Sequence, residues 1–244
     1  MKLGLAETLS LAEKVREKFK DFAEGTVAVC PNLLSTIQVK EILRGTPVKL
    51  GAQDVFWENN GAYTGEISSS MLVEAGCEYV IVGHSERRKY QMENYEMIHR
   101  KIRAVLGVPE DLIPIVCIGE NWDERKTDRR DYILYEQLQQ ALSGINVVGN
   151  QQIIVAYEPI WAIGSGTAIE PEEAEYAHKI VKLTLNDMYG TKIVNHNFRI
   201  IYGGSINSKN VKGFIGLENL DGLLVGGASL DAEEFYKVAT AIAK

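Results

Sequence analysis

Hydrophobic and polar residues form two alternating patterns along the chain. Amphipathic stretches with helical spacing alternate with short, continuous apolar runs that are rich in β-branched residues. The amphipathic pattern predicts helices over residues 5–23, 35–43, 71–75, 95–106, 127–142, 174–188, 211–217 and 231–244. The apolar runs predict strands over residues 26–30, 48–52, 79–82, 113–118, 153–157, 198–202 and 222–225.

The order of these elements is one helix followed by seven strand–helix units. Strands of this kind are typical of a parallel sheet that is buried on both faces. No Pro/Gly/Ser-rich linker divides the chain, so we expect one domain over residues 1–244. The count is one strand short of a closed eight-stranded barrel. It fits either an open doubly wound sheet or a (β/α)8 barrel without its first strand.

Composition narrows the class of protein. The chain has 244 residues, 45% of them hydrophobic, which is enough for a sizeable core. A net charge of −7 without a Lys/Arg block argues against nucleic acid or an anionic membrane as partner. No apolar stretch approaches membrane-spanning length, and the N-terminus does not resemble a signal peptide. Cys30, Cys77 and Cys117 lie in or beside apolar runs, as reduced core thiols of a cytosolic protein would.

One strand ends in a candidate catalytic carboxylate. The apolar run at 153–157 leads directly to Glu158, and Pro159 then ends the strand. A carboxylate at the tip of a buried strand is costly to desolvate, which favours a role as a base near neutral pH. The alternative is a solvated glutamate at an ordinary strand end.

A second candidate follows another strand. His84 comes after the run at 79–82 and opens a predicted helix at residue 85. Because a helix N-terminus disfavours the imidazolium form, we expect a neutral His84 that donates a hydrogen bond. The alternative is a histidine that only caps the helix. The remaining histidines are interpreted as structural or solvated: His99, His178 and His196.

Glycine-containing turns follow three successive strands. They contain Gly164, the Gly203-Gly204-Ser205 turn and the Gly226-Gly227 turn. Backbone N–H groups in such turns can bind a phosphate, although glycine is also the ordinary turn residue. Residues 53–70 form a loop that is long for a compact domain, which indicates a function of its own.

Several motifs together resemble the triose-phosphate isomerase family. They are Tyr157-Glu158-Pro159-Ile160-Trp161-Ala162-Ile163-Gly164-Ser165-Gly166, Val82-Gly83-His84-Ser85-Glu86-Arg87-Arg88, Gly61-Ala62-Tyr63-Thr64-Gly65-Glu66-Ile67-Ser68, Cys117-Ile118-Gly119-Glu120, Tyr202-Gly203-Gly204-Ser205 and Gly226-Gly227. The resemblance covers nearly the whole chain in the right order. It implies a (β/α)8 barrel, usually a homodimer, that interconverts dihydroxyacetone phosphate and glyceraldehyde 3-phosphate without a cofactor or metal. It also implies a cytoplasmic enzyme of glycolysis and gluconeogenesis.

The resemblance also implies roles for individual residues. Glu158 resembles the base of the family and His84 its neutral electrophile, a pairing known for this enzyme. Glu86 resembles the supporting carboxylate that follows the histidine, and residues 159–168 resemble the lid. The phosphate would be held by Gly164, Ser205, Gly226 and Gly227. The tip of the loop that enters the neighbouring subunit would contain Tyr63, Thr64 and Glu66.

The start of the chain departs from the family pattern. Family members begin with a strand that ends Asn-x-Lys-Met-Asn, and that lysine and asparagine touch the substrate. Here Met1 aligns just after the lysine, and Lys2 falls one position late. Two functions therefore remain open: a triose-phosphate isomerase, and a catalytically crippled phosphate-binding relative. Turnover of glyceraldehyde 3-phosphate, with Glu158→Gln as control, distinguishes them. A generic phosphate-binding barrel is a weaker third alternative.

Overall fold

The computed structural model describes residues 1–109, 112–163 and 169–243. Its strands are β1 (Ala28–Val29), β2 (Lys49–Ala52), β3 (Tyr79–Val82), β4 (Ile113–Ile118), β5 (Ile153–Tyr157), β6 (Phe198–Tyr202) and β7 (Gly222–Leu223). Its helices are α1 (Leu5–Phe19), α2 (Thr36–Leu43), α3 (Ser69–Glu74), α4 (Ser85–Tyr90), α5 (Tyr95–Leu106), α6 (Trp122–Lys126), α7 (Arg130–Leu142), α8 (Pro171–Tyr189), α9 (Thr191–Asn197) and α10 (Ala232–Ile242). Short 3-10 helices are η1 (Leu33–Ser35), η2 (Ile160–Ala162), η3 (Val211–Phe214) and η4 (Gly227–Leu230).

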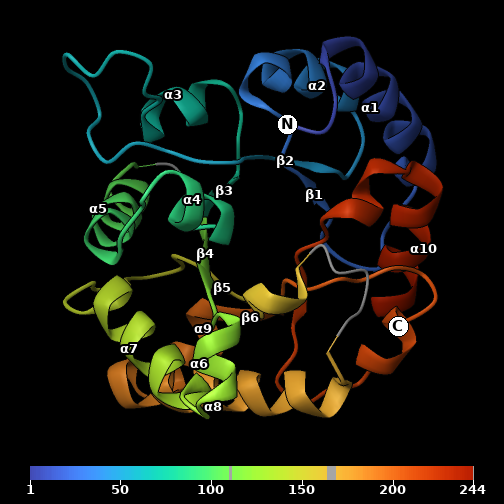
Figure 1. The fold of residues 1–244 in the computed structure, drawn as a ribbon. Coiled ribbons are helices and arrows are strands. Elements are labelled where there is room, and N and C mark those ends of the chain that lie inside the picture. Colours follow the sequence, from blue (N-terminus) through green and yellow to red (C-terminus); the bar gives the residue numbers. More distant parts are fainter. Residues whose placement is uncertain (110–111, 164–168, 244) are drawn as a thin grey trace.

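The strands form one parallel sheet in chain order, from β1 to β7. The longest ladder joins β5 to β6, with Val155 opposite Ile200. The sheet curls, and the helices surround it on the outside (Figure 1). This arrangement confirms the predicted parallel α/β fold, and it brings all carboxyl ends of the strands to one rim.

Alternate residues of each strand face two different cores. Val80 and Val82 belong to the large core between the sheet and the helices. The inner face carries a smaller cluster of buried residues, Ile115, Cys117, Ala156 and Ile201. Half-buried residues pack against this inner cluster from neighbouring strands: Tyr79, Ile81, Ile154 and Leu224. The inner face is therefore apolar along β3 to β7 but is less completely buried than the outer face.

The two ends of the sheet lie between the first and last helices. Among the described residues, none forms a strand between β1 and β7, and residues 1–4 precede α1 without joining the sheet. Phe19 of α1 packs on Phe235 of α10 at 5.3 Å between ring centroids and on Tyr236 at 5.2 Å. This contact places the first and last helices side by side, as Figure 1 also shows in blue and red. The described part is thus a curled sheet of seven parallel strands whose end strands, β1 and β7, are not paired with each other.

Several predicted boundaries are wrong for identifiable local reasons. A helix was expected over 127–142, but α7 begins only at Arg130. Helix α6 precedes it and was not predicted; Asn121 caps α6 by accepting hydrogen bonds from the amides of Asp123 and Glu124. Asp128 has φ 55°, which separates α6 from α7. Helix α9 was not predicted, and Gly190 with φ 81° separates it from α8. The strands expected at 26–30 and 222–225 are shorter, because each has a single neighbour among the described strands.

His178 of α8 is a buried histidine that should make stability depend on pH. Its ring lies between those of Tyr157 and Tyr202, at centroid distances of 5.8 and 6.3 Å. Burial lowers the pKa of His178 to about 4. Between pH 6.5 and 4 the unfolded chain therefore binds more protons than the folded chain. The stability that comes from keeping His178 neutral and buried is complete above pH 6.5 and is lost on acidification.

We therefore expect His178 to remove about 3 kcal/mol from the free energy of unfolding as pH falls from 7 to 4. Urea unfolding at both pH values measures it, with His178→Gln as the reference that lacks this titration. His84 has a raised pKa and acts in the opposite sense, so the difference between the two proteins is the relevant quantity. Equal pH dependence in both would contradict the prediction.

Candidate active site

Glu158 lies at the carboxyl end of β5 and is almost completely buried, with its side chain 1% exposed. Its amide donates to the carbonyl of Ile118 at 2.7 Å, which continues the β4–β5 ladder by one step. Glycine is required at two neighbouring strand ends. A Cβ on Gly119 would overlap with the Glu158 carbonyl, and a Cβ on Gly203 would lie 2.9 Å from Glu158 Cγ. The alternative of a solvated glutamate is wrong.

His84 and Glu158 face each other across the rim. His84 Nε2 lies 3.0 Å from Glu158 Oε1, and the Ser85 amide donates to Glu158 Oε2 at 3.1 Å. His84 Nδ1 accepts a hydrogen bond from the Glu86 amide at 3.3 Å, so His84 also caps α4. The capping interpretation of His84 is therefore confirmed, and its role as a hydrogen-bond donor to substrate stays a prediction. With Nδ1 as acceptor, a neutral ring carries its proton on Nε2 and donates it to Glu158.

The environment of His84 contains opposing influences on its pKa. Burial lowers the pKa, but the hydrogen bond and negative charge of Glu158 outweigh burial and raise it above the ordinary value. The Glu86 carboxylate adds a weaker attraction, with its Oε2 3.8 Å from Nδ1. The sequence indicated the helix N-terminus but not this close carboxylate. A neutral His84 stays a prediction.

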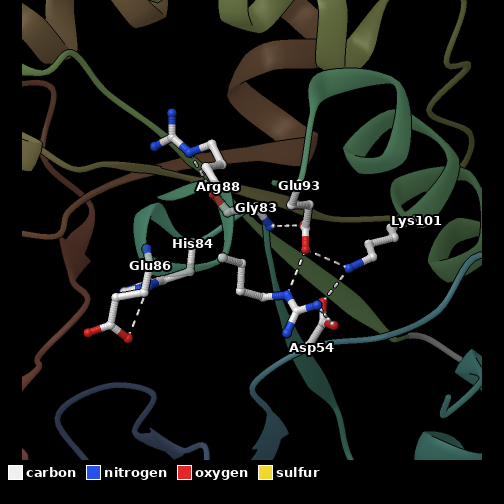
Figure 2. A network of polar contacts seen from close by, with 8 residues as sticks. Asp54, Gly83, His84, Glu86, Arg88, Glu93 and Lys101 are labelled. Atoms are coloured by element: carbon white, nitrogen blue, oxygen red, sulfur yellow. Dashed lines mark hydrogen bonds and ion pairs between the residues drawn. The ribbon is translucent and has the colours of Figure 1, made fainter. Parts of the chain in front are cut away.

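Four charged side chains form a cluster behind His84, which we call the ion cluster: Asp54, Arg87, Glu93 and Lys101. Glu93 and Lys101 are almost fully buried, while Asp54 and Arg87 are partly exposed; Figure 2 labels Asp54, Glu93 and Lys101. Lys101 Nζ lies 2.6 Å from Asp54 Oδ1 and 2.8 Å from Glu93 Oε2. Arg87 contacts the same two carboxylates at 2.8 and 2.6 Å. Burial raises the pKa of Glu93, but the two cations outweigh it and hold that pKa below its usual value.

The ion cluster is joined to the backbone that carries His84. Glu93 Oε1 accepts a hydrogen bond from the Gly83 amide at 3.1 Å. Arg88 Nε donates to the Gly83 carbonyl at 3.0 Å, and its Nη1 donates to the hydroxyl of Tyr95 at 2.7 Å. Charge-assisted hydrogen bonds therefore hold both the N–H and the C=O group of Gly83, the residue before His84. The residue after β3 is thus held by Arg88 of α4 and by Glu93 of the segment between α4 and α5.

Glu120 is a second buried carboxylate near Glu158. It is 0% exposed and accepts hydrogen bonds from the Tyr157 hydroxyl at 3.2 Å and from Trp161 Nε1 at 2.9 Å. Burial raises the pKa of Glu120, which the donated hydrogen bonds partly offset. Glu120 thus connects the end of β4 to η2, the short helix that follows Glu158 and Pro159.

The structure describes three of the four predicted phosphate-binding residues. Ser205 follows β6, and its hydroxyl donates to the Ala162 carbonyl at 3.0 Å, so it lies beside the segment that follows Glu158. Gly226 and Gly227 are exposed at the start of η4. Gly164 and the part of the predicted lid over 164–168 lie outside the described residues. Within the described residues, no group of three or more His, Cys, Asp or Glu side chains could hold a metal ion.

The predicted interface loop is exposed. Tyr63 is 44% exposed and packs on Phe56 at 4.7 Å, while Thr64 and Glu66 are also exposed at its tip. In the described part of the chain, no helix is long and apolar enough to cross a membrane. The three cysteines are free, and burial raises the pKa of Cys77 to about 11, as expected for unreactive core thiols.

Sequence reasoning missed the ion cluster. One signal could have indicated it: Lys101 falls in the apolar stripe of α5, where Ile98, Ile102 and Val105 are all buried. A lysine at such a position needs a buried carboxylate partner. The sequence did not indicate which carboxylates those partners would be, because Asp54 is 47 residues away.

Comparisons with known proteins agree with one another. A family model described as triosephosphate isomerase matches residues 1–242. The chain is 41% identical to the triosephosphate isomerase of Dictyoglomus turgidum over 96% of this chain and 92% of that protein. The protein of the same name from Caldanaerobacter subterraneus subsp. tengcongensis matches with the same identity and coverage. A crystal structure of triosephosphate isomerase from Bartonella henselae has a TM-score of 0.87 at 28% identity, over 100% of this chain and 96% of that one.

Proposed function

The chain belongs to the triosephosphate isomerase family, and we propose that it interconverts dihydroxyacetone phosphate and glyceraldehyde 3-phosphate through an enediolate, with Glu158 as the base. The reaction moves a proton between two adjacent carbons of a triose phosphate. It requires a base, a group that polarises the carbonyl, and an anchor for the phosphate. Residues at the carboxyl ends of the strands supply candidates for each of these tasks.

The observation that carries the proposal is the 3.0 Å approach of His84 Nε2 to Glu158 Oε1. Glu158 takes the carbon-bound proton with its carboxylate. His84 donates from Nε2 to the substrate oxygens and shuttles protons between them, while its Nδ1 is held by the Glu86 amide. The buried position of Glu158 excludes water from the base, which protects a reactive enediolate.

Phosphate binding is proposed for the turns after β6 and β7. Ser205, Gly226 and Gly227 would donate backbone or hydroxyl hydrogen atoms to the phosphate, and Gly164 would complete the group. The support is positional, because Ser205 contacts the segment that follows Glu158. Binding of this kind uses dipoles rather than formal positive charge, which suits a chain of net charge −7.

One observation favours reduced activity, the second candidate function. No lysine forms a hydrogen bond or ion pair with Glu158 or His84 among the described residues, and Lys2 is exposed. Loss of one preorganised electrostatic group at such a site costs about 10²–10³-fold in turnover. We therefore expect a chain without a lysine at this site to turn over substrate about 10²–10³-fold more slowly than the same chain with one.

The test is a comparison of two proteins in a coupled assay of glyceraldehyde 3-phosphate turnover. One is the chain itself, and the other carries an added amino-terminal strand ending in Asn-x-Lys. We expect the added strand to pair between β1 and β7 and to raise kcat by about 10²–10³-fold. A matched strand ending in Asn-x-Met controls for the missing cation. Equal kcat for all three proteins would contradict the role given to the absent lysine.

The remaining features follow from the same proposal. The protein acts as a single domain and as a homodimer in the cytoplasm, in glycolysis and gluconeogenesis, without a cofactor. The exposed tip with Tyr63, Thr64 and Glu66 is the proposed subunit contact, because a half-exposed aromatic ring on a protruding loop suits an interface. Sedimentation of the wild-type chain and of Tyr63→Ser tests the dimer.

A further inference from the structure

Trp161 of η2 is held by three residues from the segment that follows β4. Its Nε1 donates to Glu120 Oε1 at 2.9 Å, and its ring lies 5.5 Å from that of Trp122. The guanidinium carbon of Arg125 lies 5.8 Å from the Trp161 ring centroid. Trp161 is the third residue after Glu158, so these contacts define the path of the chain directly beyond the base.

Arg125 also makes a second contact, with another part of the chain. Its Nη2 forms an ion pair with Glu173 in the first turn of α8, and the two side chains are 23% and 37% exposed. One guanidinium therefore connects η2 to the start of α8. The backbone of Arg125 is held in place by helix α6, because Asn121 and Glu124 form a reciprocal capping box at the start of that helix.

The connection between Trp161 and Glu158 is short and stiff. Pro159 fixes one backbone torsion with φ −66°, and the Ala162 amide donates to the Pro159 carbonyl at 2.8 Å. The Ile160 amide donates to the Glu120 carbonyl at 3.1 Å. A displacement of Trp161 therefore changes the direction in which the Glu158 side chain leaves the backbone. Small displacements matter, because a misplacement of about 1 Å in a site costs up to ~10²-fold in rate.

We propose that Arg125 is a positioning residue for the reaction, which fixes Trp161 against α6 and α8 and thereby orients the Glu158 carboxylate. The inference rests on the proposed function of Glu158 as base. Each contact of Arg125 is individually weak, since it is a partly exposed cation–π contact or a partly exposed ion pair. Their combination on one planar group makes arginine suitable here, because lysine can neither stack nor contact both partners in the same way.

The experiment uses the full chain with Arg125→Ala and Arg125→Lys, and with Arg129→Ala as matched control. Arg129 lies near Arg125 in sequence but stacks on Tyr132 at 5.6 Å. Labelling with 5-fluorotryptophan gives resonances for the three tryptophans, assigned by Trp57→Phe and Trp122→Phe. The ¹⁹F shift and width of Trp161 report its environment, while kcat and KM report the reaction.

For Arg125→Ala we expect kcat to fall about tenfold, KM to stay within twofold, and the Trp161 resonance to shift or broaden. Arg125→Lys should recover part of both effects, and Arg129→Ala should change neither. An unchanged kcat, or a lower kcat with an unchanged Trp161 resonance, would overturn the proposal. If the wild-type chain shows no turnover, the proposed function fails; an unchanged Trp161 resonance in Arg125→Ala would then refute the fixing of Trp161 independently.

Discussion

Replacement of Glu158 by glutamine should lower kcat by about 10²–10⁴-fold while the protein stays folded. The amide has the size of the carboxylate, and its oxygen can still accept the hydrogen bond from the Ser85 amide that Glu158 accepts at 3.1 Å. It cannot take a proton from carbon. KM should change little, because the residues proposed to bind the phosphate are others. The loss therefore isolates proton transfer from binding.

The matched control is Glu172→Gln, which makes the same chemical change at an exposed position in the first turn of α8. Its kcat should equal that of the wild-type chain. Circular dichroism and urea unfolding establish that both variants are folded. Wild-type kcat in a folded Glu158→Gln protein would exclude Glu158 as the base.

Replacement of Lys101 by methionine should produce the largest loss of stability, about 3–5 kcal/mol in the free energy of unfolding. The side chain of Lys101 is 3% exposed and contacts Glu93, which is equally buried, and Asp54. Methionine keeps much of the volume but leaves two carboxylates of the ion cluster facing Arg87 alone. An uncompensated buried charge is costly because the interior solvates it poorly. Urea unfolding at pH 7 measures the change.

Lys179→Met on the exposed face of α8 is the control, and it should alter the free energy of unfolding by less than about 0.5 kcal/mol. The difference in the free energy of unfolding between the wild-type chain and Lys101→Met should be largest near neutral pH and should shrink as pH falls. The Glu93 pKa is lowered by Lys101 and Arg87, so its contribution to stability is present above its unfolded value and is lost as pH falls. A Lys101→Met protein as stable as Lys179→Met would mean that the ion cluster does not hold the fold together.

The sequence predicts the elements that local pattern determines. Strands β3, β4, β5 and β6 match their predicted ranges because each is a largely apolar run, interrupted by the exposed Arg199 in β6, that is buried on its outer face. Strands β1 and β7 are shorter than predicted, because each pairs with only one neighbouring strand among the described residues. The hydrophobic pattern does not indicate how many neighbours a strand has. Helices α6 and α9 are short and depend on capping and turn residues rather than on periodicity, so the hydrophobic pattern did not predict them.

The sequence likewise identified the main residues of the candidate site but not the contacts between them. Glu158 and His84 could be identified as candidates from the sequence, because each lies within two residues of the end of a strand and parallel strands end at one rim. Their direct contact, and its effect on the His84 pKa, could not be found, since it depends on the distance between two rotamers from different units. Contacts of Arg125 with Trp161 and Glu173 likewise join residues 36 and 48 positions apart.

The most direct test of the account is proton NMR of glyceraldehyde 3-phosphate incubated with the chain in D₂O. If Glu158 transfers the proton through an enediolate, dihydroxyacetone phosphate forms above the rate without protein, and deuterium from the solvent enters at the carbon that accepts the proton. Both signals should disappear in Glu158→Gln and persist in Glu172→Gln. A folded wild-type chain that produces neither signal above the protein-free rate, or a Glu158→Gln chain that produces both at the wild-type rate, would contradict it.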